Sequence, residues 1–194
     1  MRTARIERST GETEIRIALN LDAAENVSIQ VPNGFFRHML ELFSFHGRFS
    51  CECDVRGDTD VDLHHTVEDT AICLGQAFRT ALGDKKGIRR YGSCTVPMDE
   101  ARVTVHLDIS GRPFVRLDGK SLVGCCGEFD AQLVPEFLRA FAVNAGITLH
   151  VIVECGDNLH HMIEAVFKAM ARALRVAVTQ DLRDGVPSTK GVLD

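Results

Sequence analysis

A six-residue pattern occurs twice in this chain and constrains its fold more than any other feature. The segment His64–Asp69 (HHTVED) resembles His160–Ala165 (HHMIEA), and each is followed by apolar residues at the three- and four-residue spacing of a helix. A second helical pattern precedes each copy, around His38 in one half and Glu136 in the other, 26 and 24 residues before the histidine doublet. We infer that the chain is an internal duplication. The expected parts are two halves of one domain, about 1–95 and 96–178, and a C-terminal tail over 179–194.

The periodicity of apolar residues predicts the same elements in both halves. Alternation of apolar and polar residues predicts half-buried strands over 12–20, 49–55, 103–109 and 147–153. Helical spacing predicts helices over 36–46, 65–82, 133–144 and 161–178. This order predicts an α+β fold in which each half has a mostly antiparallel four-stranded sheet with two helices on one face. The sheets and helices are expected to pack in layers.

Charge and composition exclude several function classes. The net charge is −5, which argues against nucleic acid as a partner, because binding to phosphate backbones needs a basic face. No apolar run approaches the ~20 residues that span a bilayer, and the N-terminus has no apolar signal core, so we expect a cytoplasmic protein without a membrane partner. The seven cysteines form no Cys-x-x-Cys pair and are expected to be reduced thiols.

The two histidine doublets supply the donors of a metal site. On a helix, His65 and Glu68 are three residues apart and share one face, as do His161 and Glu164. The first histidine of each doublet is rotated by about 100° and is expected to reach a different ion, across a half or subunit boundary. Imidazole and carboxylate donors without thiolate suit Mn, Fe, Co or Zn. One ion would have His38, His65, Glu68 and a histidine like His160, and the other Glu136, His161, Glu164 and a histidine like His64.

Motifs along nearly the whole chain resemble those of one enzyme family. They are FFRHMLE around His38, HHTVEDT from His64, KGIRRYG from Lys86, LDISGRP from Leu107, HHMIEAVFKA from His160 and PSTKGVL from Pro187. From about Glu12 to Leu193 the chain resembles the imidazoleglycerol-phosphate dehydratases. The resemblance implies a hydro-lyase of histidine biosynthesis that converts imidazoleglycerol phosphate to imidazole-acetol phosphate and water, with two Mn²⁺ ions per active site. It also implies a homo-oligomer of 24 subunits with active sites at subunit interfaces.

The resemblance assigns residues to the substrate as well. Two guanidinium forks, a hydroxyl and an ammonium would bind the phosphate dianion, and we expect the tail to order over it. Glu12 matches an early family glutamate and is the expected acid/base, with Glu68 and Glu164 as further candidate catalytic carboxylates. The phosphate ligands implied are Arg90, Arg112, Ser188 and Lys190. The other expected substrate contacts are Glu12, His38, His46, His64, His65, His160, His161 and Lys168.

Four positions fall outside the family pattern or its ligand set. Arg37 stands where the family usually has Asp, which removes a partner that would orient His38. Glu136 stands where many relatives have His, although a carboxylate can still bind a hard ion. His106 and His150 match no ligand position and are expected to be structural residues.

The chemistry expected of the resemblance begins with a substrate ring held as imidazolate by two cations, which stabilise the negative charge of the transition state. Proton loss beside the ring and departure of the hydroxyl would give a diazafulvene-like intermediate, with Glu12 or a metal-bound water shuttling protons. Two other function classes share some of these features. A dinuclear metal hydrolase would release phosphate. A non-enzymatic metal-binding assembly protein would leave the basic residues without a purpose.

Overall fold

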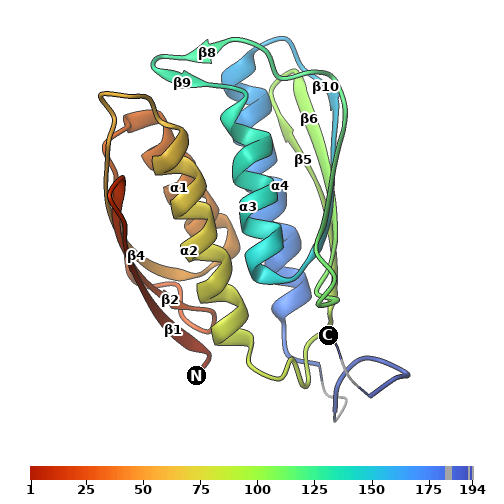
Figure 1. Ribbon diagram of the computed structural model, residues 1–194. Coiled ribbons are helices and arrows are strands. Elements are labelled where there is room, and N and C mark those ends of the chain that lie inside the picture. Colours follow the sequence, from red (N-terminus) through yellow and green to blue (C-terminus); the bar gives the residue numbers. More distant parts are fainter. Residues whose placement is uncertain (182–184, 192, 194) are drawn as a thin grey trace.

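The computed structural model describes residues 1–181, 185–191 and 193. Two four-stranded sheets form the outer layers, and four helices fill the space between them (Figure 1). Helix α2 (His64–Leu82) packs on the first sheet and α4 (Leu159–Val178) on the second. Helices α2 and α3 (Leu133–Ala145) pack against each other, as do α1 (Gly34–Gly47) and α4, so the two halves meet through their helices.

The first half forms a sheet with the strand order β1-β2-β4-β3. Its strands are β1 (Thr3–Ser9), β2 (Thr13–Asn20), β3 (Val27–Gln30) and β4 (Ser50–Gly57). Neighbouring strands are antiparallel except β3 and β4, which are parallel. This is the mostly antiparallel sheet that the alternating sequence predicts.

The second half repeats this arrangement with the order β5-β6-β10-β7 and one parallel pair, β7 with β10. Its strands are β5 (Tyr91–Met98), β6 (Ala101–Asp108), β7 (Phe114–Gly119) and β10 (Thr148–Cys155). A small hairpin, β8 (Cys125–Cys126) and β9 (Phe129–Asp130), is added to this half. The duplicated α+β fold is therefore confirmed, although the second sheet starts at Tyr91, ahead of the boundary expected near residue 95.

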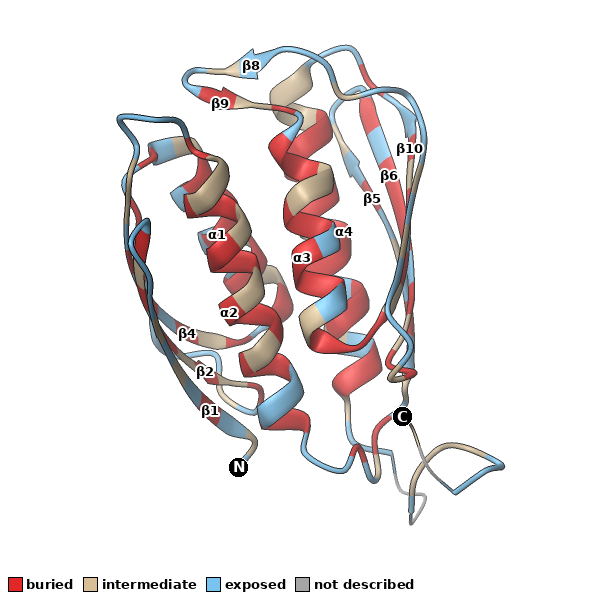
Figure 2. Cartoon of the chain, viewed as in Figure 1, coloured by how far each residue is buried: buried red, intermediate tan, exposed pale blue. Residues whose placement is uncertain are grey.

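The core lies where the helices face the sheets and each other, as the buried surfaces in Figure 2 show. Aromatic rings of both halves share it: the ring of Phe78 on α2 lies 5.3 Å from that of Phe141 on α3 and 5.9 Å from that of Phe43 on α1. Burial of such a side chain contributes about 1.5–3 kcal/mol. A single core therefore fixes the orientation of the two halves.

Gly75 sets the distance between α2 and α3. A Cβ atom at this position would lie 2.6 Å from the backbone oxygen of Phe141 and 3.0 Å from the backbone nitrogen of Ala145. The absence of a side chain at Gly75 lets the two helices approach this closely.

The starts of α2 and α4 place the histidine doublets in the first helical turn. The side chain of Asn158 caps α4 and accepts a hydrogen bond of 2.9 Å from the backbone N–H of His160. The carboxylate of Asp62 accepts one of 2.6 Å from the N–H of His64. Both doublets consequently project from the same end of the helical layers. Among the helices of the described residues, none has the length and apolar character for crossing a bilayer.

Candidate metal centre and phosphate pocket

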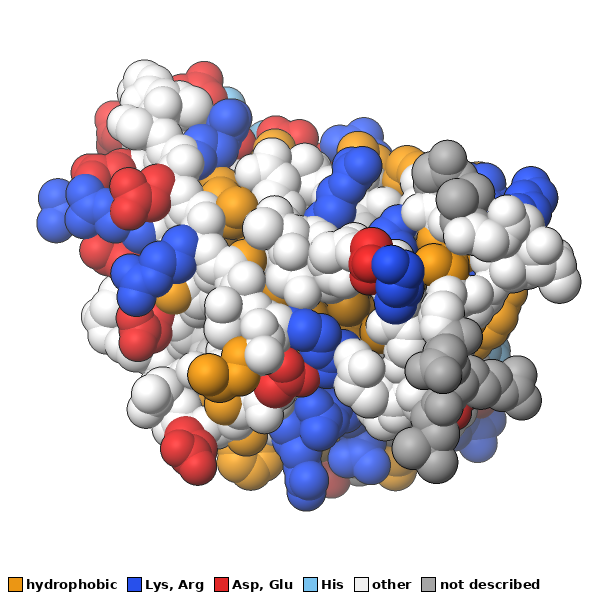
Figure 3. All heavy atoms as spheres, turned by 90° about the horizontal axis from the view of Figure 1, so that it is seen from below, with side chains coloured by type: hydrophobic (Ala, Val, Ile, Leu, Met, Phe, Trp, Pro, Cys, Tyr) orange, Lys and Arg blue, Asp and Glu red, His pale blue; other side chains and the backbone are white. Residues whose placement is uncertain are grey.

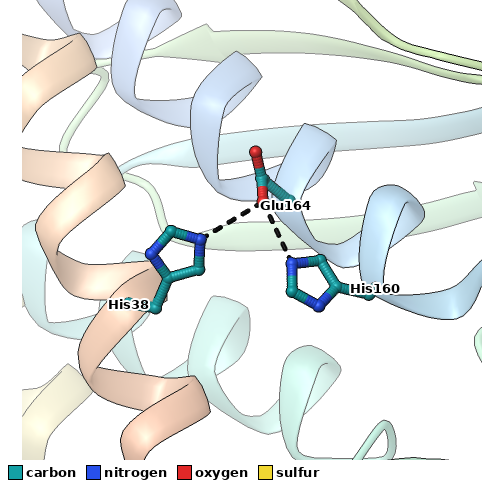
Figure 4. A group of neighbouring side chains, drawn as sticks. All are labelled: His38, His160 and Glu164. Carbon is teal, nitrogen blue, oxygen red and sulfur yellow. Dashed lines mark hydrogen bonds and ion pairs between the residues drawn. The ribbon is translucent and has the colours of Figure 1, made fainter.

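The first candidate metal cluster lies between α1 and α4 and contains His38, His160 and Glu164 (Figure 4). The Nε2 atoms of His38 and His160 lie 3.3 and 3.1 Å from Oε2 of Glu164. Glu164 is buried, whereas both rings are about half exposed. The three side chains converge on one point that opens to the surface.

The second cluster lies between α2 and α3 and contains His64, Glu68 and Glu136. Its ligand atoms, like those of the first cluster, all lie within 4.8 Å of one another. The Nε2 atom of His64 is 3.7 Å from Oε2 of Glu68. The duplication relates the two clusters. Each combines two residues from the start of a doublet helix in one half with one residue from the first helix of the other half.

Within one chain the donors group differently from the two ligand sets expected. His38 does lie with His160, and Glu136 with His64, but the glutamates are exchanged: His38 meets Glu164, and Glu136 meets Glu68. Within each doublet the first histidine shares the cluster with the glutamate four residues later. A separation of four residues leaves an offset of about 40° around the helix and one of three residues about 60°, so both histidines lie near the face of the glutamate. The packing of α1 against α4 brings His38 to the side of His160.

The second histidine of each doublet lies outside both clusters. His65 and His161 belong to neither group of converging donors. Their Nδ1 atoms are held by carboxylates, Asp58 at 2.9 Å and Glu100 at 2.8 Å, which raise the pKa of each ring. Sequence reasoning missed both carboxylates. Each stands next to a strand end, and that position is the only signal the sequence offers.

Glu164 is held in the charged form. Burial alone would raise the pKa of Glu164, but the hydrogen bonds of Lys168, His160 and His38 together lower it below its usual range. In the second cluster, Glu136 pairs with Arg139. Imidazole nitrogen and carboxylate oxygen donors without a thiolate fit a divalent ion such as Mn²⁺.

The remaining substrate candidates on these helices are Lys168 and His46. Lys168 contacts Glu164 of the first cluster and lies 3.6 Å from the sulfur of Met98. The pKa of His46 is lowered by burial and by the nearby cations Lys168 and Arg172. Lys168 therefore adjoins the first cluster, whereas His46 lies eight residues after His38 on α1, and neither belongs to a donor group.

The predicted phosphate ligands line one pocket of about 750 Å³ at the tail end of the molecule. Lys and Arg side chains gather on this end, which Figure 3 shows from below. Part of the tail lies outside the described residues (182–184, 192 and 194), and the rest forms one wall of the pocket. The structure brings together all four expected ligands, Arg90, Arg112, Ser188 and Lys190.

Arg90 is occupied by contacts within the chain. Its Nε and Nη2 donate to the carboxylate of Asp108 at 2.6 and 3.0 Å, and Nη1 donates to the carbonyl of Pro187 at 2.9 Å. Arg112 is exposed, and its nearest Asp108 oxygen is 3.9 Å away. Arg90 therefore ties the tail to the second sheet, while Arg112 and Lys190 line the pocket.

Three other sequence candidates lie outside the clusters. Glu12, in the turn between β1 and β2, has its Oε1 3.7 Å from Nε2 of His65. His106 and His150 lie on the outer face of the second sheet, where Ser93 contacts Nδ1 of His106 at 2.8 Å and the ring of His150 packs near Phe114. Neither strand histidine belongs to a group of converging metal donors within the described residues.

Comparison with known proteins identifies relatives along the full chain. The model of the imidazoleglycerol-phosphate dehydratase family matches residues 32–174. Proteins of that name from Clostridium botulinum (strain Hall) and Bacillus pumilus are 55% and 54% identical over 98% and 100% of this chain, and 97% and 100% of their own. Among solved structures, imidazoleglycerol-phosphate dehydratase from Staphylococcus aureus has a TM-score of 0.83 at 39% identity, covering 92% of this chain and 99% of that one. The Pyrococcus furiosus enzyme in complex with (S)-C348 has a TM-score of 0.85 at 34% identity, covering 97% and 100%.

Proposed function

Because the chain belongs to the imidazoleglycerol-phosphate dehydratase family, hydro-lyases of histidine biosynthesis, we propose that each cluster holds one Mn²⁺ ion and that subunits share the active site. The established reaction converts imidazoleglycerol phosphate to imidazole-acetol phosphate and water. Neither a hydrolase that releases phosphate nor a non-enzymatic assembly protein fits a member of this family.

The distance between the clusters and the phosphate pocket carries the proposal of a shared site. His160 of the first cluster lies at the start of α4, whereas the pocket adjoins its end, where the backbone N–H of Arg90 donates to the carbonyl of Ala177 at 3.0 Å. At 1.5 Å per residue, the helix separates the two places by roughly 25 Å. A substrate of about ten heavy-atom bonds cannot span that distance. The pocket of one chain would therefore complete the clusters of another.

The outward histidines support the same conclusion. Each cluster offers three ligand atoms, and an octahedral ion has room for one more protein donor as well as substrate. His65 and His161 turn away from their own clusters and would supply that donor to a neighbouring subunit. A homo-oligomer of 24 subunits, with two ions at each active site, agrees with this arrangement.

In the proposed mechanism the chain's own residues bind, orient and move protons. Arg112, Ser188 and Lys190 bind the phosphate, which fixes the carbon that loses its proton. Glu12, whose carboxylate faces Nε2 of His65, accepts the proton from that carbon. The hydroxyl of the neighbouring carbon leaves as water, and a proton returned to that neighbouring carbon converts the enol to the ketone. When bound, the two cations supply positive charge that stabilises the negative charge developing on the imidazole ring.

Metal removal tests the first part of the proposal. We expect the wild-type protein to bind two Mn²⁺ ions per chain, to lose activity in a chelator and to regain it on addition of Mn²⁺. Activity is measured by the absorbance of the enol that the ketone product forms in alkali. Glu68→Gln should weaken the binding of one ion. Glu154→Gln, on the outer face of the second sheet, should weaken neither. Full activity of the metal-free protein would overturn the metal assignment.

Mixing of variants tests the shared site. Glu164→Gln damages a cluster, and Arg112→Ala damages the pocket, so each variant alone should be nearly inactive. When both chains are produced together, intact clusters of one chain can meet an intact pocket of the other. Activity well above the sum of the two variants is the expected result. Activity no greater than that sum, in oligomers shown to contain both chains, would place the whole site within one chain.

A further inference from the structure

We propose that Asp58 and Glu100 are positioning residues that hold the rings of His65 and His161 with Nε2 facing outward, ready to bind a cation of a neighbouring subunit. This inference rests on the proposed metal sites and extends them to two carboxylates that belong to neither cluster. The same contact is made independently in each half of the molecule.

In the first half the carboxylate comes from the end of β4. Oδ2 of Asp58 lies 2.9 Å from Nδ1 of His65. The other oxygen, Oδ1, is buried and has no hydrogen-bond partner among the described residues. The backbone N–H of Asp58 donates to the carbonyl of Glu12 at 3.1 Å, which fixes the position of the carboxylate. The ring of His65 is thus its main polar partner.

In the second half the carboxylate comes from the turn between β5 and β6. Oε2 of Glu100 lies 2.8 Å from Nδ1 of His161. Its Oε1 accepts hydrogen bonds from the backbone N–H groups of Asp157 and Asn158, at 3.0 and 2.7 Å. These bonds attach Glu100 to the start of α4 and, together with His161, hold its pKa at about 2. The acceptor for His161 is therefore rigid.

The two carboxylates occupy different places in the duplicated fold. Asp58 follows the strand that precedes its histidine helix, whereas Glu100 lies in a hairpin turn of its sheet. A contact inherited from one ancestral half would use the same element twice. Instead, two different elements supply a carboxylate to the same atom, Nδ1, of equivalent histidines. This coincidence indicates a requirement at the ring itself rather than a by-product of the fold.

The chemical consequence is a defined tautomer. A charged carboxylate can only accept a hydrogen bond, so Nδ1 must carry the hydrogen. The neutral ring then has its lone pair on Nε2, which is the arrangement of a histidine that binds a metal through Nε2. The carboxylate also makes the ring a more basic donor.

Acidic side chains also face the outward nitrogen. Nε2 of His65 is 3.7 Å from Glu12, and Nε2 of His161 is 3.9 Å from Asp99. These separations are too long for hydrogen bonds, and within the described part of the chain neither Nε2 atom has a shorter polar contact. A cation bound there would lie among negative charges. A simple ion pair with a protonated ring is the competing explanation, and the experiment below separates the two.

The test measures Mn²⁺ binding by the intensity of the free-ion EPR signal. Glu100→Gln should lower the affinity of the full-length protein for one of its two Mn²⁺ ions 10- to 100-fold and leave the affinity for the other unchanged. Asp58→Asn should lower the affinity for the other ion by a similar factor. Glu154→Gln is the matched control, because it removes a carboxylate bonded to Thr104 and Arg102 rather than to a histidine. Melting temperatures of the metal-free proteins report any general loss of stability.

A double-mutant cycle decides whether Glu100 acts through His161. If it does, adding Glu100→Gln to His161→Asn will not weaken binding beyond His161→Asn alone. Equal further loss in both backgrounds would show a purely structural role and overturn the inference. Wild-type affinity for both ions in Glu100→Gln and Asp58→Asn would also overturn it. If the wild-type protein bound no Mn²⁺, the proposed function itself would fail, and the two failures are therefore distinguishable.

Discussion

The contact at Gly75 predicts that a single methyl group there will disturb one metal cluster and spare the other. In the interior of a helix, Ala is favoured over Gly by about 1 kcal/mol, so Gly75→Ala would stabilise an isolated α2. In the folded protein, however, the new Cβ would lie 2.6 Å from the backbone oxygen of Phe141. An ordinary contact begins near 3.4 Å, so α2 and α3 would have to separate by about 0.8 Å.

The two energies can be compared. The clashing atoms include backbone of α3, which cannot rotate away as a flexible side chain would. Overpacking of this kind typically costs about 1–3 kcal/mol. After subtraction of the helix preference, we expect the free energy of unfolding to fall by up to about 2 kcal/mol. Urea denaturation of the metal-free protein measures this loss.

The displacement also reaches the cluster between α2 and α3. Glu68 lies seven residues before Gly75 on α2, and Glu136 is on the facing helix. Metal–ligand distances tolerate only about 0.2 Å, so a separation of about 0.8 Å should weaken the ion held by His64, Glu68 and Glu136. The ion between α1 and α4 should be bound as in the wild type.

Gly34→Ala is the matched control. Gly34 begins α1, and a Cβ atom there would meet nothing within 4 Å. This variant should be as stable as the wild type and should bind both ions normally. If Gly75→Ala behaved like Gly34→Ala in both measurements, the close approach of α2 and α3 would not set the geometry of the cluster.

Three further predictions concern the phosphate pocket, the thiols and an ion pair. Asp108→Asn removes the charged acceptor of Arg90, a hydrogen bond worth about 1.5–3 kcal/mol. The KM for the phosphorylated substrate should therefore rise roughly tenfold or more, while Mn²⁺ binding stays unchanged. An unaltered KM would contradict this role of Asp108. Iodoacetamide should modify exposed Cys125 but not Cys51, because burial raises the pKa of the Cys51 thiol to about 12, and peptide mass spectrometry will show which is labelled. Hydrogen bonds from Arg2 lower the pKa of Asp22, so the stability lost in Asp22→Asn should be constant near neutral pH and disappear as the pH falls below about 4, as measured by urea denaturation.

The regular elements could be predicted from the sequence because their periodicity records which face is buried. The prediction of a helix over 133–144 agrees with α3 at Leu133–Ala145, and the strand over 12–20 with β2 at Thr13–Asn20. The strands β1, β3, β5 and β7 were not predicted. They are the edge strands of the two four-stranded sheets and bury few side chains, so apolar alternation is weak in their sequences.

The members of the metal clusters could also be predicted, but not their grouping. Sequence spacing shows that Glu164 shares a helix face with a histidine, yet residues three and four positions away both satisfy that condition. Only the packing of α1 against α4 selects His160, because it brings His38 to that side of the helix. Contacts with other elements, such as that of Glu100 with His161, leave no periodic trace.

The crossing of donors between the halves has a consequence for the origin of the chain. Neither half could assemble a cluster alone, since His38 comes from one half and Glu164 from the other. Two separate copies related by a twofold axis would have built both clusters by exchanging helices symmetrically. In such a homodimer, positions 38 and 136 would be encoded by one codon and would have to change together. Duplication within a single polypeptide lets the two positions differ, and they now carry an imidazole and a carboxylate.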